Sequence, residues 1–188
     1  MPTTQDSSRP DPSKQLLVVS ILAPDQPGLL QHITRTVKDC GCNIAESRMT
    51  LLAGEFTMLL LIAGNWNMLT RLENQLPKLE SQLGLRLCLR RSTASLPPQE
   101  RLPYAIDAVC VDQPGIIFNL ASFFTERGIG IHDLTTRGYP AVHTGTSMVS
   151  VQMTVDIPAD LHLGTLRDDF TDFCDQLNLD AVLEPIKS

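Results

Sequence analysis

The first half of the chain alternates between apolar runs and segments in which apolar residues recur every three or four positions. Residues 16–22 form an apolar, partly β-branched run, which predicts a buried strand. The next segment predicts an amphipathic helix that ends at Gly41. Its apolar stripe consists of Leu29, Ile33, Val37 and Cys40.

Two further strands, a second helix and a last strand complete this half. Residues 42–52 and 55–63 are predicted to form a hairpin. The second helix follows Asn65, and Pro77 should kink it or shorten its last part. Its apolar positions are Leu69, Leu72, Leu76, Leu79 and Leu83. With an alternating strand over residues 85–89, the order is β-α-β-β-α-β, the ferredoxin-like split unit.

The same pattern begins again in the second half. The first strand and helix recur at an offset of 87 residues, and the second helix and last strand recur at an offset of 94. Matching Thr57-Met58 with Ser147-Met148 gives 90 for the hairpin, which predicts about three extra residues there and four before the second helix. The fold class is therefore α+β: two tandem ferredoxin-like domains, each an antiparallel sheet covered by two helices.

The domain boundaries follow from composition. Residues 1–14 are polar with three prolines and predict a disordered tail. The first domain is expected over residues 15–92. Residues 93–102, which include Pro97-Pro98, have linker composition, and the second domain is expected over residues 103–187.

Charge is distributed unevenly between the halves. The net charge is −6, with +2 on residues 1–94 and −8 on residues 95–188. A protein that grips nucleic acid directly normally presents a basic face, so direct binding is disfavoured. An RNA-recognition motif shares the strand order but needs aromatic residues on its central strands, where only Tyr104 is found.

Cysteine and histidine usage predicts neither a metal site nor a cofactor. The five cysteines are an odd number in apolar or helical contexts, which fits a reducing compartment. Cys40-Gly41-Cys42 has the wrong spacing for half a zinc site, and His132, Asp133 and His143 are a weak metal set. The N-terminal segment has no apolar signal core, and no run is long enough to span a membrane. We therefore expect a cytoplasmic protein.

One turn appears twice, between the first strand and first helix of each half. Asp25-Gln26-Pro27-Gly28-Leu29 recurs as Asp112-Gln113-Pro114-Gly115-Ile116. Proline suits the first helical position, and the Asp or Gln before it can cap the helix. Glycine leaves backbone N–H groups accessible at the positive end of the helix dipole, which suits a small anion such as a carboxylate.

Simpler interpretations of these residues remain open. Asp25 and Asp112 could be helix caps without a ligand role. Gly28 and Gly115 could be needed only for close packing of helix on sheet. Asn43, which follows the first predicted helix, could be present only because asparagine tolerates the backbone conformation found where a helix ends.

A β-α-β-β-α-β unit with Asp-x-Pro-Gly-Leu/Ile at its first strand–helix turn resembles the ACT domain. The resemblance spans roughly residues 15–92 and 103–187. Three further segments resemble the first domain of the glycine cleavage system transcriptional repressor family. They are Cys40-Gly41-Cys42-Asn43-Ile44, Glu55-Phe56-Thr57 and Gly64-Asn65-Trp66-Asn67.

The resemblance implies a small-molecule sensor. It implies binding of an amino acid, glycine being suspected, and contact with a DNA-bound activator of the glycine cleavage genes, with no direct DNA binding. The implied ligand-binding residues are Asp25, Gln26, Pro27, Gly28, Leu29, Asn43 and Ile44 in the first domain and Asp112, Gln113, Pro114, Gly115 and Ile116 in the second. Gly130 stands at the position of Asn43, which puts a second site in doubt.

Other functions are weaker on these residues. The alternative is a regulatory subunit or module of an amino-acid metabolic enzyme. Because both predicted domains use up nearly the whole chain and no nucleophile–base set stands out, we expect no enzyme activity. Exposed sheet edges favour pairing between copies of the chain, and therefore a homodimer.

Overall fold

The computed structural model describes residues 15–92 and 101–186, which form two compact units. The division between the units falls within residues 93–100. The predicted tail over residues 1–14 and most of the predicted linker lie outside the described residues.

The first unit has the predicted β-α-β-β-α-β order. Its elements are β1 (Gln15–Pro24), α1 (Leu29–Asp39), β2 (Asn43–Leu52), β3 (Glu55–Gly64), α2 (Trp66–Leu83) and β4 (Arg86–Ser92). The strands form an antiparallel sheet in the order β2-β3-β1-β4.

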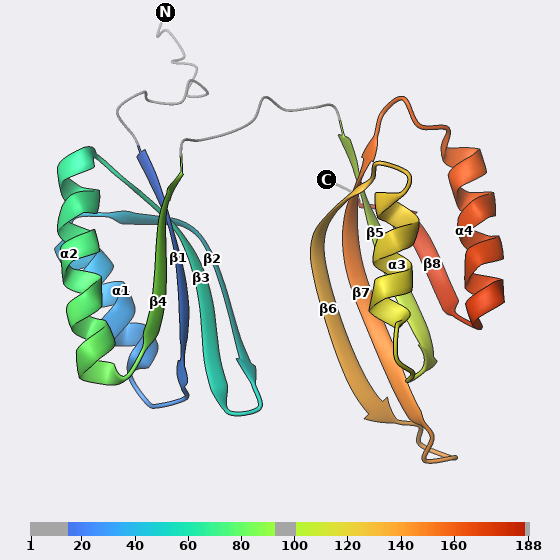
Figure 1. Ribbon diagram of the computed structural model, residues 1–188, viewed down its shortest axis with the longest axis horizontal. Helices are drawn as coiled ribbons and strands as arrows, with labels where there is room; N and C mark the ends of the chain where they lie inside the picture. The colour runs from blue at the N-terminus through green and yellow to red at the C-terminus, as the bar shows by residue number, and fades with distance from the viewer. Residues whose placement is uncertain (1–14, 93–100, 187–188) are drawn as a thin grey trace, which may run out of the picture. The chain divides into compact units, whose positions relative to one another are not determined.

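The second unit repeats this arrangement. Its elements are β5 (Arg101–Val111), α3 (Ile116–Thr125), β6 (Gly130–Pro140), β7 (Ser147–Pro158), α4 (Leu163–Leu177) and β8 (Asp180–Pro185). The sheet order β6-β7-β5-β8 is that of the first unit, and β5 begins two residues before the predicted domain start. The predicted α+β class with tandem ferredoxin-like domains is confirmed (Figure 1).

In each unit both helices lie on one face of the sheet (Figure 1). The hydrophobic core lies between this face and the helices. The predicted stripe of α1 is buried: Leu29, Ile33 and Val37 are at most 2% exposed. They pack with inward side chains of β1 and β3, such as Leu17 and Ile62. Period-2 strands and a period-3.6 helix thus present their apolar faces to one another.

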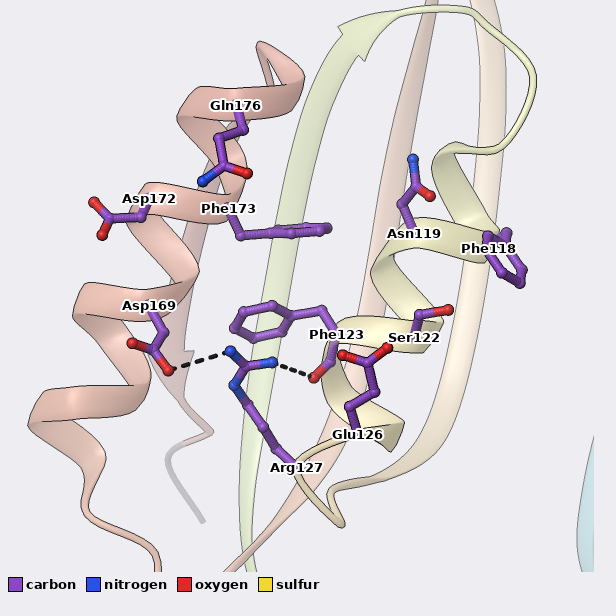
Figure 2. Close-up of a pocket in the computed structure, with 10 residues that line it drawn as sticks. All are labelled: Phe118, Asn119, Ser122, Phe123, Glu126, Arg127, Asp169, Asp172, Phe173 and Gln176. Atoms are coloured by element: carbon purple, nitrogen blue, oxygen red, sulfur yellow. Dashed lines mark hydrogen bonds and ion pairs between the residues drawn. The ribbon is translucent and has the colours of Figure 1, made fainter.

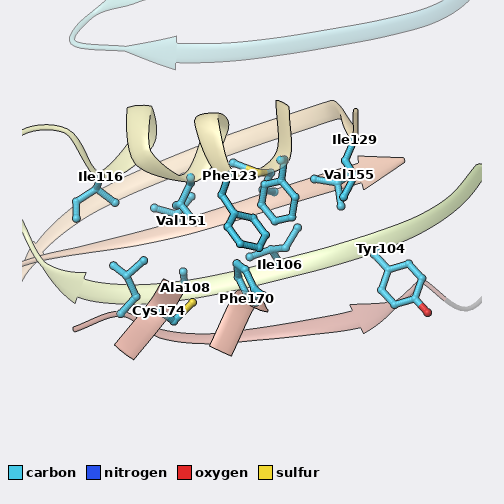
Figure 3. Close-up of a cluster of buried hydrophobic side chains, with 14 of the residues drawn as sticks. Tyr104, Ile106, Ala108, Ile116, Phe123, Ile129, Val151, Val155, Phe170 and Cys174 are labelled. Atoms are coloured by element: carbon cyan, nitrogen blue, oxygen red, sulfur yellow. The ribbon is translucent and has the colours of Figure 1, made fainter. Parts of the chain in front are cut away.

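The core of the second unit is aromatic (Figure 3). Phe123 and Phe124 on α3 meet edge to face with ring centroids 5.1 Å apart, and Phe170 on α4 lies 5.4 Å from Phe123. Such pairs add to the stabilisation from burial alone. No buried polar or charged side chain is found among the described residues of either unit.

The two hairpins differ more than the sequence comparison predicted. Each edge strand has a register shift at matching places, between Ile44 and Glu46 in β2 and between Ile131 and Asp133 in β6. Leu22 pairs with Thr57, whereas its counterpart Val109 pairs with Ser150, so β3 and β7 match at an offset of 93. The offset of 90 was wrong, because similar residue types are weaker evidence than pairing register. Six extra residues therefore lie in the second hairpin, and one precedes α4.

Helix α2 lacks one of the two effects predicted for Pro77, a shortened last part. It continues through Pro77 to Leu83, so the proline does not shorten it. The helix has firm ends: the Asn65 side chain accepts a hydrogen bond from the Met68 N–H at 2.9 Å, and Gly84 closes the other end with φ of 67°. Four buried leucines on the sheet side hold the helix across the proline, and they are Leu69, Leu72, Leu76 and Leu79.

No helix in the described segments is both long and apolar enough to cross a membrane.

Candidate functional site

The repeated turn has a geometry different from the predicted one. Gly28 has φ of 86° and ψ of −5°, values of the third position of a type II turn, and α1 begins only at Leu29. The Leu29 N–H donates to the Gln26 carbonyl at 3.3 Å, which closes that turn. Pro27 was therefore wrongly placed at the first helical position. Its fixed φ suits the second position of the turn instead.

The predicted capping role of the aspartates is also wrong. The N-caps of α1 and α3 are Gly28 and Gly115, and neither helix has a side-chain cap hydrogen bond. The Asp25 N–H donates to the Gly54 carbonyl at 2.9 Å, and the Asp112 N–H donates to the Ser147 carbonyl at 2.9 Å. Each turn is thereby tied through its backbone to the neighbouring hairpin, which leaves the aspartate side chain uncommitted to the helix.

The start of α1 retains the features of an anion site. The first helical hydrogen bond runs from the His32 N–H to the Gly28 carbonyl at 3.0 Å. The N–H groups of Leu30 and Gln31 precede it and have no intrahelical acceptor, as at any helix start. The Gln26 amide instead donates to the Leu83 carbonyl at 3.1 Å and anchors the turn to the end of α2. The resemblance implies Gly28 and Leu29 as the carboxylate donors. The Leu29 N–H closes the turn, so the N–H groups without a helical acceptor are those of the next two residues.

The turn of the second domain borders a cavity of about 340 Å³. This volume lies in the range of small-molecule sites. The turn, the start of α3 and the inward face of two strands supply its walls: Asp112, Gln113, Gly115, Ile116, Ile117, Phe118, Thr136 and Val149. One carboxylate and a helix N-terminus therefore face a largely apolar hollow.

The matching space in the first domain is more crowded. At the equivalent positions Met49 replaces Thr136 and Phe56 replaces Val149, and both replacements are larger. A Cβ on Gly28 would lie 3.9 Å from the His32 ring, whereas a Cβ on Gly115 would meet nothing within 4 Å. The second turn consequently offers more room for a ligand than the first.

Asn43 and Ile44 do not lie beside the turn of their own domain. Asn43 pairs with Ala63 at one end of β2, whereas Leu52 at the other end pairs with Glu55 next to the turn. The two ends are nine residue steps apart along the strand, a distance of about 30 Å at roughly 3.3 Å per step. Gly130 is equally far along β6 from the second turn, so the change from Asn43 to Gly130 leaves the cavity there intact.

Chemistry beyond binding has little support at this site. Burial, together with the negative charge of Asp112, raises the pKa of the Cys110 thiol just before the turn, which keeps it protonated. Across residues 15–92 and 101–186, no group of three or more potential ligands could hold a metal ion.

Sequence reasoning missed the residues that make the cavity. Ile117, Phe118, Thr136 and Val149 come from three separate segments and belong to no motif. Aligning the two repeats could have identified Thr136 and Val149, because both differ in size from their counterparts in the first domain. With the correct offset of 93, the change from Phe56 to Val149 marks a large core side chain replaced by a smaller one at the cavity wall.

Most of the chain is similar in sequence to known proteins. Residues 15–89 match the family model described as ACT domain. The glycine cleavage system transcriptional repressor of Escherichia coli (strain K12) is 32% identical over 166 residues, which cover 88% of this chain and 87% of that protein. The protein of the same description from Shigella flexneri matches equally.

Two solved structures share the two-domain fold. A crystal structure described provisionally as a glycine cleavage system transcriptional repressor has a TM-score of 0.71 at 26% identity, covering 93% of this chain and 99% of that one. A protein from Galdieria sulphuraria has a TM-score of 0.75 at 23% identity, with the same coverage, and shows the fold alone.

Proposed function

The chain belongs to the family of glycine cleavage system transcriptional repressors, and from this premise we propose that it senses an amino acid, with glycine as the first candidate. It acts through a protein partner, a DNA-bound activator of the glycine cleavage genes, and does not read DNA itself. The family and its ACT domain support a regulatory role.

The cavity beside the second turn is the observation that carries the sensing proposal. The ligand carboxylate lies at the start of α3, where N–H groups and the helix dipole favour an anion. The Asp112 carboxylate attracts the ligand ammonium. The first turn, Asp25 to Leu29, has more crowded surroundings and is proposed as the weaker of the two sites.

Charge supports action through a protein partner. Residues 95–188 carry a net −8, which opposes direct contact with phosphates. Strands β2 and β6 are sheet edges with unpaired backbone groups in each unit, which supports pairing of two chains in a homodimer.

Calorimetry of the full chain with single amino acids tests the sensing proposal. Thr136→Met gives the second cavity the side chain of the first domain and should weaken glycine binding at least tenfold. Thr135→Met is the matched control, because Thr135 pairs with Gln152 and lies on the opposite face of the same strand. A folded wild-type chain that releases no heat with any amino acid would refute the proposal.

Gel retardation tests the route of action. The chain alone should leave glycine cleavage promoter DNA unshifted and should alter the mobility of the activator–promoter complex. Tight, salt-dependent binding to the bare promoter would show that the chain reads DNA itself.

A further inference from the structure

The second domain has a groove on its helical side, between α3 and α4, which we call the α3/α4 groove (Figure 2). Its volume is about 480 Å³. Phe123 and Phe173 form its floor with ring centroids 4.8 Å apart, and Ser122, Glu126, Asp169 and Asp172 stand along its sides. An aromatic floor between polar rims is the anatomy of a protein interface.

The groove is associated with three large side chains that lie between α3 and α4: Phe123, Arg127 and Phe173. The Arg127 guanidinium lies 3.8 Å from the centroid of the Phe123 ring and donates to the Phe123 carbonyl at 3.0 Å and to Asp169 at 3.2 Å (Figure 2). In the first domain the positions of Phe123, Phe173 and Arg127 hold Thr36, Leu79 and Cys40, and the backbones of α1 and α2 approach each other more closely. The larger residues hold α3 and α4 apart.

The groove is negatively charged. Arg127 is paired with Asp169, whereas Glu126 and Asp172 make no ion pair within the described part of the chain. In the first domain Lys78 stands at the position of Asp172, and Arg35 stands at the position of Ser122. In the first domain Asp39 stands at the position of Glu126 and pairs with Arg35, so the acidic, aromatic-floored groove belongs to the second repeat alone. The shared fold does not require this difference.

We propose that the α3/α4 groove docks an amphipathic helix of the partner protein. The docked helix inserts large apolar side chains over Phe123 and Phe173 and sets Lys or Arg against Glu126 and Asp172. Helices dock in grooves of this kind through apolar residues at spacings of three and four, with charge complementarity guiding the encounter. This inference rests on the proposed function, which requires a protein partner. The groove itself is the evidence for where that partner binds.

A peptide probe tests this site without the partner. The probe is a fluorescein-labelled 18-residue helix with a leucine stripe flanked by lysines, and fluorescence anisotropy measures its affinity for the full chain. Two variants give the groove the residues of the first domain, Asp172→Lys and Ser122→Arg. Asp168→Lys is the matched control, because it makes the same charge change on the same helix at an exposed residue outside the groove.

We expect each groove variant to weaken the peptide at least tenfold, and Asp168→Lys to stay within twofold of wild type. A scrambled peptide of equal composition should bind at least tenfold more weakly than the probe. Equal losses in Asp172→Lys and Asp168→Lys would show unspecific attraction and overturn the proposal, as would the absence of binding to wild type.

Light scattering, which measures the oligomeric state, tests whether a second copy of the chain occupies the groove instead. If Ser122→Arg converts a wild-type dimer to monomer, a second copy covers the groove and the proposal is wrong. The peptide titration contains no amino acid, so its failure is separate from failure of the sensing proposal, which the calorimetry alone decides.

Discussion

The ion pair between Glu73 on α2 and Arg91 on β4 fastens the second helix of the first domain to its edge strand. Arg91 donates through Nε and Nη2 to the two Glu73 carboxylate oxygens at 2.7 and 2.8 Å. It also donates to Thr70 at 2.9 Å and to Gln15 at 2.7 Å. Glu73→Gln keeps the shape of the side chain and removes one charged acceptor.

The loss in free energy of unfolding that we expect from Glu73→Gln follows from this geometry. A hydrogen bond to a charged group stabilises a protein by about 1.5–3 kcal/mol, and Glu73→Gln weakens two. The side chains are 30% and 28% exposed, so water screens part of the interaction. Arg91 also keeps its bonds to Thr70 and Gln15. We expect the free energy of unfolding of the first domain to fall by roughly 1–2 kcal/mol at pH 7.

The loss should depend on pH with a definite sign. The hydrogen bonds from Arg91, aided by its charge, lower the pKa of Glu73 in the folded state. A lowered folded pKa means that the pair stabilises the protein fully above the ordinary pKa of Glu, about 4.3. That stabilisation disappears as pH falls through the lowered folded value. Wild type and Glu73→Gln should therefore converge in stability towards pH 3.

Urea unfolding followed by circular dichroism measures these differences in the full chain. Fluorescence of Trp66, the one tryptophan of the sequence, identifies the transition of the first domain. Asp39→Asn is the control, since Asp39 and Arg35 are 3.9 Å apart and their side chains are 63% and 74% exposed. Its cost should stay below about 0.5 kcal/mol. Equal effects of the two variants, or a Glu73→Gln effect unchanged between pH 7 and pH 3, would refute the reasoning.

Two further predictions concern backbone strain and thiol reactivity. Gly28→Ala and Gly115→Ala place a side chain at φ of 86° and 97° and should each destabilise their own domain by about 1–2 kcal/mol in urea unfolding. Gly138→Ala, which has no positive φ, should not be destabilising. In iodoacetamide labelling followed by mass spectrometry, exposed Cys88 should react first. Cys174, whose pKa burial raises to about 11, should react slowly at pH 8, and rapid modification of native Cys174 would contradict its burial.

The fold was predictable because its signals are local and repeated. The stripe of Leu29, Ile33 and Val37 identified a helix, and its second copy at Ile116, Leu120 and Phe124 identified a duplication. Loop lengths were not predictable in the same way. Of the six residues added to the second hairpin, four lengthen its loop and two extend the paired strands by one residue each. No local pattern reports the strand pairing that fixes this register.

The candidate site was predictable only in part. The Asp-Gln-Pro-Gly motif predicted a turn between strand and helix in each domain, because a proline–glycine pair has a restricted set of turn conformations. The position of Asn43 was not predictable, since ten residues of β2 carry the chain from it to the hairpin beside the turn. The cavity depends on Thr136 and Val149, which only the three-dimensional pairing brings to Gly115.

Phe118 borders both the turn cavity and the α3/α4 groove, and it is 73% exposed. An exposed side chain of this kind exchanges among a few staggered χ1 rotamers. Its one conformation in the structure lines both hollows, so a ligand that moves the Phe118 side chain in one hollow changes the wall of the other. An amino acid and a docked helix would therefore be thermodynamically linked through one torsion angle, and the linkage would be equal in both directions.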